Sequence, residues 1–444
     1  MVKRLMLLAM VMACNAGKDP VVGSSDTGDG GTEVQDFPLF EGLFSVGFSV
    51  GPVAGLIQPL QFESTMSVND EGERNIDHLI LRAANVEGEV SEDLVSISDV
   101  PVASDGSFVI DWDPFILPGP FSPTENPVEL DSVMTGDLRD ESTMCGEVTG
   151  EIVSFDMDLA GSTFATVKWE DRILGTPAAC DGEVAEEIQP IDVCPEMTAG
   201  RVLDFPSGGM DREYELHIPD GYVAGTATPL VFVFHGIGSN IDSMLANENL
   251  LEEANATGHI ILAPQALDRG GTSAWDPVGP PGYNTDIALF DDLLTCMSEK
   301  YSIDPERIHV TGMSLGGIFT GTLISSRSEI IASAAPFSGG LFRTKSEGWQ
   351  AIPTIVSWGG PDDTYFGQDF DVLAGSMAAS LFEDGHFVIR CNHNRGHALG
   401  ADLWPYAFRF FMDHPQGISP LPYEGAGLPA EFPDFCAVMT ASND

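Results

Sequence analysis

The sequence predicts two folded parts in series: an all-β domain, and then a doubly wound α/β domain with a mostly parallel sheet. In the first half, short strand-like segments alternate with turn residues, and no 3.6-residue periodicity is found. In the second half, continuous apolar segments of strand length alternate with helix-like segments, which is typical of a parallel sheet covered on both faces. The chain has 444 residues, 43% of them hydrophobic, and this is enough to fill two ordinary cores.

Residues 1–13 have the composition of a secretory signal peptide. Two basic residues precede an apolar run over residues 5–12, which is too short for a membrane span of about 20 residues. The tetrad that ends at Cys14 resembles the lipobox of bacterial lipoproteins, so we expect export and acylation of Cys14, with plain secretion as the alternative. Residues 14–36 are rich in Gly, Asp, Ser and Thr, and we expect them to form a flexible acidic tether behind the lipid anchor.

Residues 37–190 are expected to form the all-β domain, a sandwich or a barrel. Strand-like segments at 78–82, 107–112 and 162–169 are separated by turn residues such as Ser104-Asp105-Gly106-Ser107. No catalytic constellation is found in this part, so its role is not predicted.

Residues 191–440 are expected to form the α/β domain. The predicted strands cover residues 230–234, 260–263, 308–311, 332–337, 354–358 and 387–390. The predicted helices cover residues 286–301, 317–326, 374–381 and 403–412.

The motif Gly312-Met313-Ser314-Leu315-Gly316 matches G-x-S-x-G, the pattern of a nucleophile elbow. A strand-like segment precedes it and a helix-like segment follows it, as a sharp strand-to-helix turn requires. Small residues on both sides of the serine let the turn pass close to neighbouring backbone. We therefore predict Ser314 as a nucleophile at the N-terminus of a helix, where free N–H groups face incoming negative charge.

Acyl transfer also needs hydrogen-bond donors for the oxyanion that develops. The strand at 230–234 runs into the glycine-rich turn His235-Gly236-Ile237-Gly238, and we assign the donors to the backbone N–H groups of Ile237 and Leu315. His235 precedes the serine on an inner strand, so a structural hydrogen bond suits it better than the role of base.

An acid and a base are expected after later strands. The strand at 354–358 ends in Gly359-Gly360-Pro361-Asp362-Asp363; we choose Asp362 as the acid and keep Asp363 as the reserve. His397 follows a glycine just before the last helix and is better placed as the base than His393. These two histidines could instead bind a metal, but no third ligand stands at a sensible spacing, so we predict no metal. The order serine, acid, histidine is the one that α/β-hydrolases use.

Residues 195–415 resemble the family of polyhydroxybutyrate depolymerases and feruloyl or acetylxylan esterases, which have the α/β-hydrolase fold. The resemblance implies a serine carboxylesterase that needs no cofactor, with its acid at Asp362. The matching stretches are Pro229-Leu230-Val231-Phe232 before His235-Gly236, Ser302-Ile303-Asp304-Pro305-Glu306-Arg307-Ile308 before Gly312-Met313-Ser314-Leu315-Gly316-Gly317, Ala335-Pro336-Phe337-Ser338-Gly339, and Gly396-His397.

Two departures from the family pattern concern the choice of substrate. Trp358-Gly359-Gly360 stands where the family often has His-Gly-Thr, and Ala398-Leu399-Gly400 stands where it often has Trp-Pro. His235, Trp275 and Trp358 are the candidate substrate contacts. We expect a neutral ester, either small or part of a polyester or a plant polysaccharide ester. The alternatives are a serine peptidase or thioesterase of the same fold, and a surface binding protein whose hydrolase domain is inert.

Six cysteines follow Cys14, and an even number in an exported chain suggests disulfides. The expected pairs are Cys145–Cys180, Cys194–Cys436 and Cys296–Cys391. The alternative is that some of these cysteines are small buried apolar residues.

Charge excludes several partners. The chain carries 68 Asp and Glu against 19 Lys and Arg, a formal net charge of −49, which disfavours nucleic acid and anionic lipid. Residues 1–190 hold 35 of the acids and 8 of the bases, so both halves are acidic. We interpret the excess as adaptation to the medium, and expect membrane contact only through the lipid anchor.

Overall fold

A computed structural model describes residues 39–50, 57–69, 73–85, 88–122, 127–155, 157–172, 187–269, 271–277, 279, 282–342, 348–365 and 368–440. The predicted signal peptide, tether and lipidation site at Cys14 lie outside the described residues, as does Cys180. None of the helices in the described part of the chain has the length and apolar character needed to cross a membrane.

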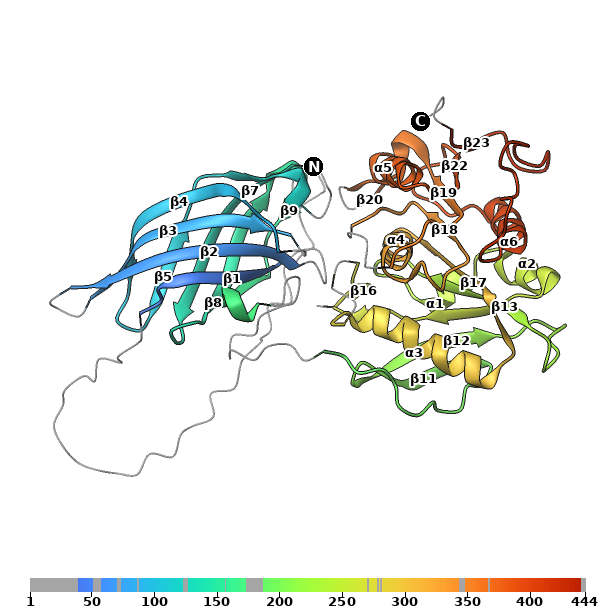
Figure 1. Cartoon of the computed structure of the whole chain (residues 1–444), viewed down its shortest axis with the longest axis horizontal. Helices are drawn as coiled ribbons and strands as arrows, with labels where there is room; N and C mark the ends of the chain where they lie inside the picture. Colours follow the sequence, from blue (N-terminus) through green and yellow to red (C-terminus); the bar gives the residue numbers. More distant parts are fainter. Residues whose placement is uncertain are drawn as a thin grey trace, which may run out of the picture. The chain divides into compact units, whose positions relative to one another are not determined.

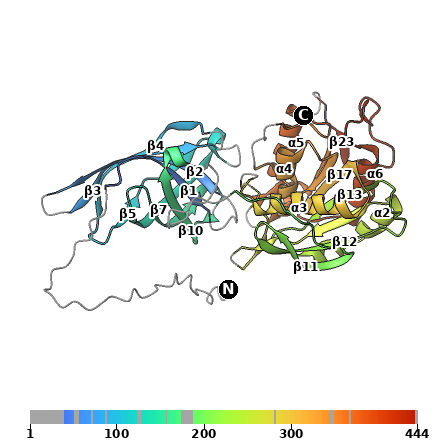
Figure 2. The same cartoon turned by 60° about the horizontal axis from the view of Figure 1, so that its bottom comes forward.

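The N-terminal part is one antiparallel sheet (Figures 1 and 2). Its strands are β1 (Gly42–Ser49), β2 (Ile57–Val68), β3 (Arg74–Ala84), β4 (Val90–Val102), β5 (Ser107–Asp111), β6 (Phe115–Leu117), β7 (Val128–Leu138), β8 (Met144–Ile152), β9 (Met157–Asp158) and β10 (Ser162–Lys168). Short 3₁₀ helices occur at η1 (Gly119–Phe121), η2 (Val153–Phe155) and η3 (Trp169–Asp171).

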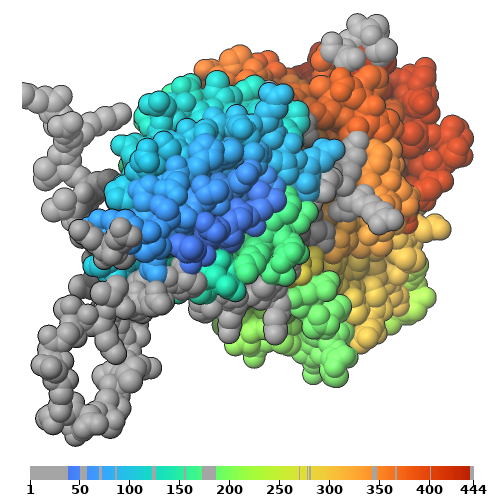
Figure 3. All heavy atoms as spheres, turned by 60° about the vertical axis from the view of Figure 1, so that its left-hand side comes forward, coloured from blue at the N-terminus to red at the C-terminus, as the bar shows by residue number. Residues whose placement is uncertain are grey.

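The sheet curls into a barrel-like shape. Its strand order is β4-β3-β2-β1-β10-β8-β7-β5, with β6 on β7 and β9 on β8. The two ends of this path, β4 and β5, are joined by residues 103–106 alone, so the ends must lie close together. Side chains such as Phe44, Phe62 and Phe164 fill the interior and are almost fully buried. The prediction of an all-β fold for this part is confirmed, and Figure 3 shows the outer surface of its first strands in blue and cyan.

The C-terminal part is built on a nine-stranded mixed sheet in the order β11-β12-β14-β13-β17-β18-β19-β22-β23. These strands are β11 (Gly200–Ser207), β12 (Met210–His217), β13 (Thr228–Phe234), β14 (Ile260–Pro264), β17 (Ile303–Met313), β18 (Ser333–Phe337), β19 (Thr354–Trp358), β22 (Val388–Asn392) and β23 (Cys436–Val438). The six central strands, from β14 to β22, are parallel, while β11, β12 and β23 pair antiparallel at the two edges.

Helices cover both faces of this sheet (Figure 1). The helices are α1 (Ile241–Leu245), α2 (Leu250–Thr257), α3 (Thr285–Lys300), α4 (Leu315–Arg327), α5 (Phe370–Glu383) and α6 (Trp404–Asp413). Along β13, Leu230, Phe232 and Phe234 belong to a buried apolar cluster that includes residues of α3, α4 and α5. Val231 and Val233 belong to a second cluster that includes residues of α1, α2 and α6. Because successive side chains of a strand point to opposite faces, a continuous apolar strand fits this doubly covered sheet.

Two small hairpins and two 3₁₀ helices complete this part. They are β15 (Leu267–Asp268) with β16 (Ser273–Ala274), β20 (Thr364–Tyr365) with β21 (Gln368–Asp369), η4 (Gly360–Asp362) and η5 (Ala401–Leu403). The strand order, with a serine-bearing turn after the central strand β17, is that of an α/β-hydrolase, as the sequence predicts.

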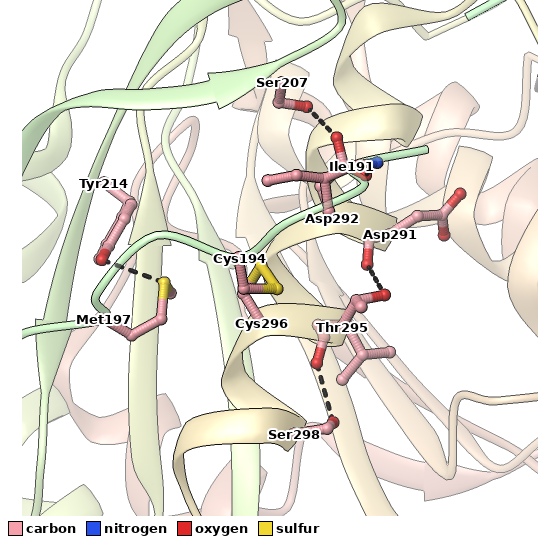
Figure 4. Close-up of a disulfide and its surroundings, with 11 residues drawn as sticks. Ile191, Cys194, Met197, Ser207, Tyr214, Asp291, Asp292, Thr295, Cys296 and Ser298 are labelled. Atoms are coloured by element: carbon pink, nitrogen blue, oxygen red, sulfur yellow. Dashed lines mark hydrogen bonds between the residues drawn. A yellow bond between two sulfur atoms is a disulfide. The ribbon is translucent and has the colours of Figure 1, made fainter. Parts of the chain in front are cut away.

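The cysteine pairing differs from the expected one. Cys194 pairs with Cys296 in α3, next to Met197 and Tyr214 (Figure 4), and Cys391 pairs with Cys436. The expected pairs Cys194–Cys436 and Cys296–Cys391 are therefore wrong. The physical reason is that β22 and β23 pair antiparallel with Cys391 opposite Cys436, so these two thiols face each other at the edge of the sheet. The pair Cys145–Cys180 stays a prediction.

Candidate active site

Ser314 lies in a sharp turn between the end of β17 and the start of α4. Its backbone has φ 59° and ψ −124°, in a region that non-glycine residues rarely adopt. The Ser314 N–H donates to the carbonyl of Phe337 at 2.9 Å, which ties the turn to β18. The first hydrogen bond of α4 runs from Ile318 N to Ser314 O, so the preceding N–H groups have no partner within the helix.

The glycines of the motif are required by close backbone contacts. A Cβ atom at Gly316 would lie 2.2 Å from the carbonyl oxygen of Phe234, and one at Gly312 would lie 2.4 Å from the carbonyl oxygen of Gly316. Such distances are far below van der Waals contact. The turn can therefore cross β13 only with glycine at these two positions, which is the reason the sequence motif predicts a local structure.

His397 connects the serine to a carboxylate. Its Nε2 lies 2.9 Å from Ser314 Oγ, and its Nδ1 lies 2.6 Å from Asp363 Oδ1. Because an ionised carboxylate can only accept, Nδ1 carries the proton, and Nε2 is left to accept the proton of the serine hydroxyl. The structure thus brings Ser314 and His397 together, 83 residues apart in the chain.

The carboxylate is that of Asp363, and the choice of Asp362 is corrected. Asp362 ends η4 with its side chain exposed, whereas Asp363 follows the turn and is fully buried. The turn is closed by a hydrogen bond from Asp363 N to Gly360 O at 2.8 Å, and it directs adjacent side chains to opposite sides. Two neighbouring aspartates look alike in the sequence, and only this turn separates them.

Three donors hold the Asp363 carboxylate. Oδ2 accepts from Gly359 N at 2.6 Å and from the hydroxyl of Ser338 at 2.7 Å, while Oδ1 accepts from His397. Burial alone would raise the pKa of Asp363, but the hydrogen bonds from His397, Gly359 and Ser338 outweigh it and hold the pKa below its usual value. The group is therefore a charged acceptor at neutral pH.

The turn after β13 lies directly against the serine. A Cβ atom built on Gly236 would lie 3.3 Å from Ser314 Cβ and 3.9 Å from Ser314 Oγ. This places the start of the Gly236-Ile237 segment beside the hydroxyl. With Leu315 as the first residue of α4, the backbone N–H groups of Ile237 and Leu315 belong to the two segments that flank Ser314 Oγ.

His235 and Trp275 hold this turn from behind. The His235 ring is 1% exposed, its Nδ1 donates to Gly236 O at 2.8 Å, and its Nε2 accepts from Ala266 N at 3.1 Å. Trp275 is fully buried and donates from Nε1 to the His235 carbonyl at 2.8 Å. Burial lowers the pKa of His235, in accord with a neutral ring. Both residues are internal supports, so their assignment as substrate contacts is not supported.

Trp358 is also placed inside. Its side chain is 7% exposed, and its Nε1 donates to Asp371 Oδ1 at 2.6 Å. The indole therefore packs between the end of β19 and the start of α5, and it offers little surface to a substrate. In this chain the tryptophan links two elements that carry the site.

His393 is separate from the hydrogen-bonded series. Its backbone N–H donates to Trp358 O at 2.9 Å, and burial lowers the pKa of its ring. Among the described residues, no three His, Cys, Asp or Glu side chains are grouped so that they could hold a metal ion.

Several residues that contact Asp363 or His397 were not identified from the sequence. Ser338, which bonds Asp363, lies in the stretch Ala335–Gly339 that carries the family resemblance, so a signal for it existed. Tyr365 and Phe370 contact the His397 ring at centroid distances of 5.0 Å and 4.5 Å, and no sequence pattern marked them.

Several curated proteins to which the chain is similar are named as feruloyl or acetylxylan esterases. Feruloyl esterase C of Emericella nidulans is 26% identical over 234 residues, 45% of this chain and 84% of that protein. The bifunctional acetylxylan esterase/xylanase XynS20E of Neocallimastix patriciarum is 27% identical over 157 residues, 35% of this chain and 22% of that protein. None of the known protein-family models matches the chain.

Solved structures are also similar to part of the chain. Crystalline native pOPH is 19% identical with a TM-score of 0.45, and the match covers 56% of this chain and 98% of that chain. The chain spans about half or less of several curated relatives that it matches, including 51% of feruloyl esterase D of Neurospora crassa and 47% of feruloyl esterase C of Aspergillus niger.

Proposed function

We propose that this protein is a serine carboxylesterase of the α/β-hydrolase fold, with Ser314 as nucleophile, His397 as base and Asp363 as the acid that orients it. The observation that carries the proposal is the continuous hydrogen-bonded series from Asp363 Oδ1 through His397 to Ser314 Oγ at a strained strand-to-helix turn. This is the arrangement that acyl transfer needs, because a free serine hydroxyl is a weak nucleophile and requires an adjacent base.

In the first step, Ser314 Oγ attacks the ester carbonyl carbon while His397 Nε2 takes the hydroxyl proton. Asp363 stays ionised and stabilises the imidazolium that forms. The N–H groups of Ile237 and Leu315 hold the oxyanion, and each such donor contributes about 2.7–4 kcal/mol to transition-state stabilisation. The tetrahedral intermediate then collapses, the C–O bond to the alcohol breaks, and His397 gives its proton to the leaving alcohol.

In the second step, a water molecule gives its proton to His397 and attacks the acyl-serine carbonyl. Collapse of this second intermediate releases the carboxylic acid and returns the proton to Ser314 Oγ. Proton transfers therefore balance over the cycle, and the reaction needs no cofactor.

The proposed substrate is a neutral ester of the feruloyl or acetyl type, small or carried by a plant polysaccharide or a polyester. The support is that the chain is similar to relatives named as feruloyl and acetylxylan esterases, over 45% and 35% of its length. Another relative, the oxidized polyvinyl alcohol hydrolase of Sphingopyxis, is 23% identical over 308 residues, 51% of this chain and 83% of that protein, so a synthetic polymer is also a candidate substrate. The net charge of −49 disfavours anionic polymers.

We also propose that the protein acts outside the cytoplasm. Two disulfides lie within the described residues, and disulfides persist in oxidising compartments. Export with a lipid anchor at Cys14 remains the proposed route.

The decisive test uses Ser314→Ala on p-nitrophenyl acetate. We expect kcat to fall about 10⁴-fold or more, because the nucleophile is lost. Ser326→Ala is the matched control: Ser326 lies on the same helix, and its hydroxyl bonds only the Thr322 carbonyl at 2.6 Å. Activity of Ser314→Ala at the wild-type level would refute the assignment.

Labelling with a fluorophosphonate separates an enzyme from an inert binding protein. Modification at Ser314, located by peptide mass spectrometry, supports the esterase, and an unmodified Ser314 supports the binding protein. The turnover of the wild-type protein is then measured on feruloyl, acetyl-xylan, short-chain acyl and 3-hydroxybutyrate esters and on a peptide substrate. Faster turnover of the peptide than of every ester would favour the peptidase.

A further inference from the structure

The His397 imidazole has two aromatic neighbours that the proposed mechanism does not use. The ring of Tyr365 lies parallel to the imidazole, with centroids 5.0 Å apart and planes at 10°, and the ring of Phe370 lies 4.5 Å away at 34°. Both centroid distances are within the range of about 6 Å in which an aromatic ring attracts a cation. In the proposed mechanism, proton transfer from the serine turns the imidazole into a cation.

Burial does not explain the position of Tyr365. Its side chain is 45% exposed, among the most exposed of the large apolar and aromatic groups, whereas Phe370 is 4% exposed and belongs to the interior. A tyrosine that packed only for its hydrophobic surface would lie deeper. The ring is instead presented at the surface with its plane along that of the histidine.

One short segment supplies both rings and the carboxylate. Asp363 comes directly before β20, which ends at Tyr365, and the hairpin partner β21 leads into Phe370 at the start of α5. The Phe370 N–H donates to the Asp363 carbonyl at 2.8 Å and closes this segment into a loop around the imidazole. Asp363, Tyr365 and Phe370 of this segment therefore supply the charge and the aromatic contacts of the base.

We propose that Tyr365 is a positioning residue that holds the His397 ring in its plane and stabilises the imidazolium formed during acyl transfer. This inference rests on the proposed esterase function and adds to it a residue that contacts the base and not the reacting ester. The face of an aromatic ring carries a negative quadrupole, so it interacts more strongly with the imidazolium than with the neutral ring. The contact therefore favours the transition state over the ground state.

Other charged groups near His397 already have partners. Asp363 is hydrogen-bonded to it, Arg395 and Asp402 form a two-bonded ion pair with each other at 2.7 and 2.6 Å, and Asp371 accepts from Trp358. Asp362, on the exposed side of η4, is the remaining neighbour in the chain. None of these hydrogen bonds and ion pairs includes Tyr365, so we expect a change in the pH profile of a Tyr365 variant to report the ring itself.

The test compares Tyr365→Leu with Tyr365→Phe. Leucine removes the ring, and we expect kcat to fall about 2- to 5-fold with KM unchanged, and the midpoint of the acid limb of the pH–rate profile to move down by about 0.5 pH unit. Phenylalanine keeps the ring and should behave like the wild type. Tyr406→Leu is the control, because it removes a comparable aromatic contact, with Phe432 at 5.2 Å, in the same domain.

A readout independent of turnover separates this inference from the esterase function. The protonation midpoint of His397, followed by NMR on a signal assigned through its absence in His397→Ala, should fall by about 0.5 pH unit in Tyr365→Leu whether or not an ester is hydrolysed. An unchanged midpoint in Tyr365→Leu would overturn the proposal. A change in KM alone would also overturn it and would make Tyr365 a substrate contact.

Discussion

Asp362 and Asp363 are adjacent in the chain but lie in opposite environments. One carboxylate is exposed to solvent, and the other is buried with donors on both oxygens. The cause is a single 3₁₀ turn that begins at Gly360, a residue with φ 74°. A position with positive φ is open mainly to glycine, so the turn and the placement of the proposed acid, Asp363, depend on that residue.

Substitution of the two aspartates separately should give opposite results. Asp363→Asn is expected to lower kcat by about 10⁴-fold, because an amide at this position no longer holds the productive tautomer of His397. Asp362→Asn removes one exposed charge and should keep activity within about twofold. Steady-state kinetics on p-nitrophenyl acetate measure both variants. Equal losses, or a larger loss for Asp362→Asn, would return the acid to Asp362.

At the scale of elements, the apolar strands and the helices that flank them were predictable from the sequence. The segments expected at 230–234, 260–263, 354–358 and 286–301 correspond to β13, β14, β19 and α3 within two residues at each end. Their signal is strong because both faces of the sheet are buried, so every position must be apolar. The elbow was predictable for a similar reason, since only glycine tolerates the contacts around Ser314.

The edge strands of the sheet were not predictable from a run of apolar residues. β11 and β12 carry charged residues such as Arg201, Glu213 and Glu215, which pair across the two strands and hide the strand pattern. The disulfides were mispredicted because their pairing depends on which segments become neighbours at the edge, and sequence separation carries no such information. The contacts of Tyr365 depend on a hairpin of two-residue strands, too short to leave a periodic pattern.

The disulfide Cys391–Cys436 is expected to support activity as well as stability. It joins β23 to β22, the strand that leads into the loop with His397. The double variant Cys391→Ser/Cys436→Ser should lose about 2–4 kcal/mol of unfolding free energy and also lose kcat, because the histidine loop is less constrained. Urea unfolding and kinetics on the same preparations test this.

The double variant Cys194→Ser/Cys296→Ser is the matched control. That disulfide joins the segment before β11 to α3 and contacts none of Ser314, Asp363 or His397. If this control variant loses a similar free energy of unfolding but keeps its kcat, the result supports a role in activity for Cys391–Cys436 alone. Equal kcat in both double variants would contradict it.

At the scale of the whole molecule, charge opposes folding. A net charge of −49 spread over both halves raises the electrostatic free energy of the compact state. Added salt screens this repulsion, and the Debye length falls from about 10 Å at 0.1 M to about 3 Å at 1 M. The melting temperature in 1 M NaCl should therefore exceed that in 0.05 M NaCl by several degrees. Scanning calorimetry is the measurement, and a melting temperature that is independent of salt would contradict the interpretation.

Acid pH should destabilise the fold through three buried histidines. His259, His309 and His414 are fully buried. Burial lowers the pKa of His259 to about 3 and that of His309 well below its usual value. Burial also lowers the pKa of His414. The unfolded chain binds protons near pH 6.5 and the folded chain does not, so stability is present above pH 6.5 and is lost as pH falls toward the folded pKa values. A histidine that is protonated in the unfolded chain and neutral in the folded chain contributes a slope of about 1.4 kcal/mol per pH unit.

Urea unfolding at pH 7.5, 6.0 and 5.0 measures this slope. His259→Gln should reduce it by about one histidine's contribution, while His217→Gln serves as the control for loss of a histidine on the partly exposed end of β12. Stability that is constant between pH 7.5 and 5.0 would show that the buried rings take up protons without cost.

The backbone at Ser314 has a consequence for laboratory evolution. A serine at φ 59° and ψ −124° is held in a conformation that costs of the order of 1–3 kcal/mol, and glycine would relieve much of it. Selection of variant libraries for heat resistance alone should therefore enrich glycine at position 314 and discard the proposed nucleophile. Stability and activity are opposed at this one residue, and a screen that retains both must include turnover.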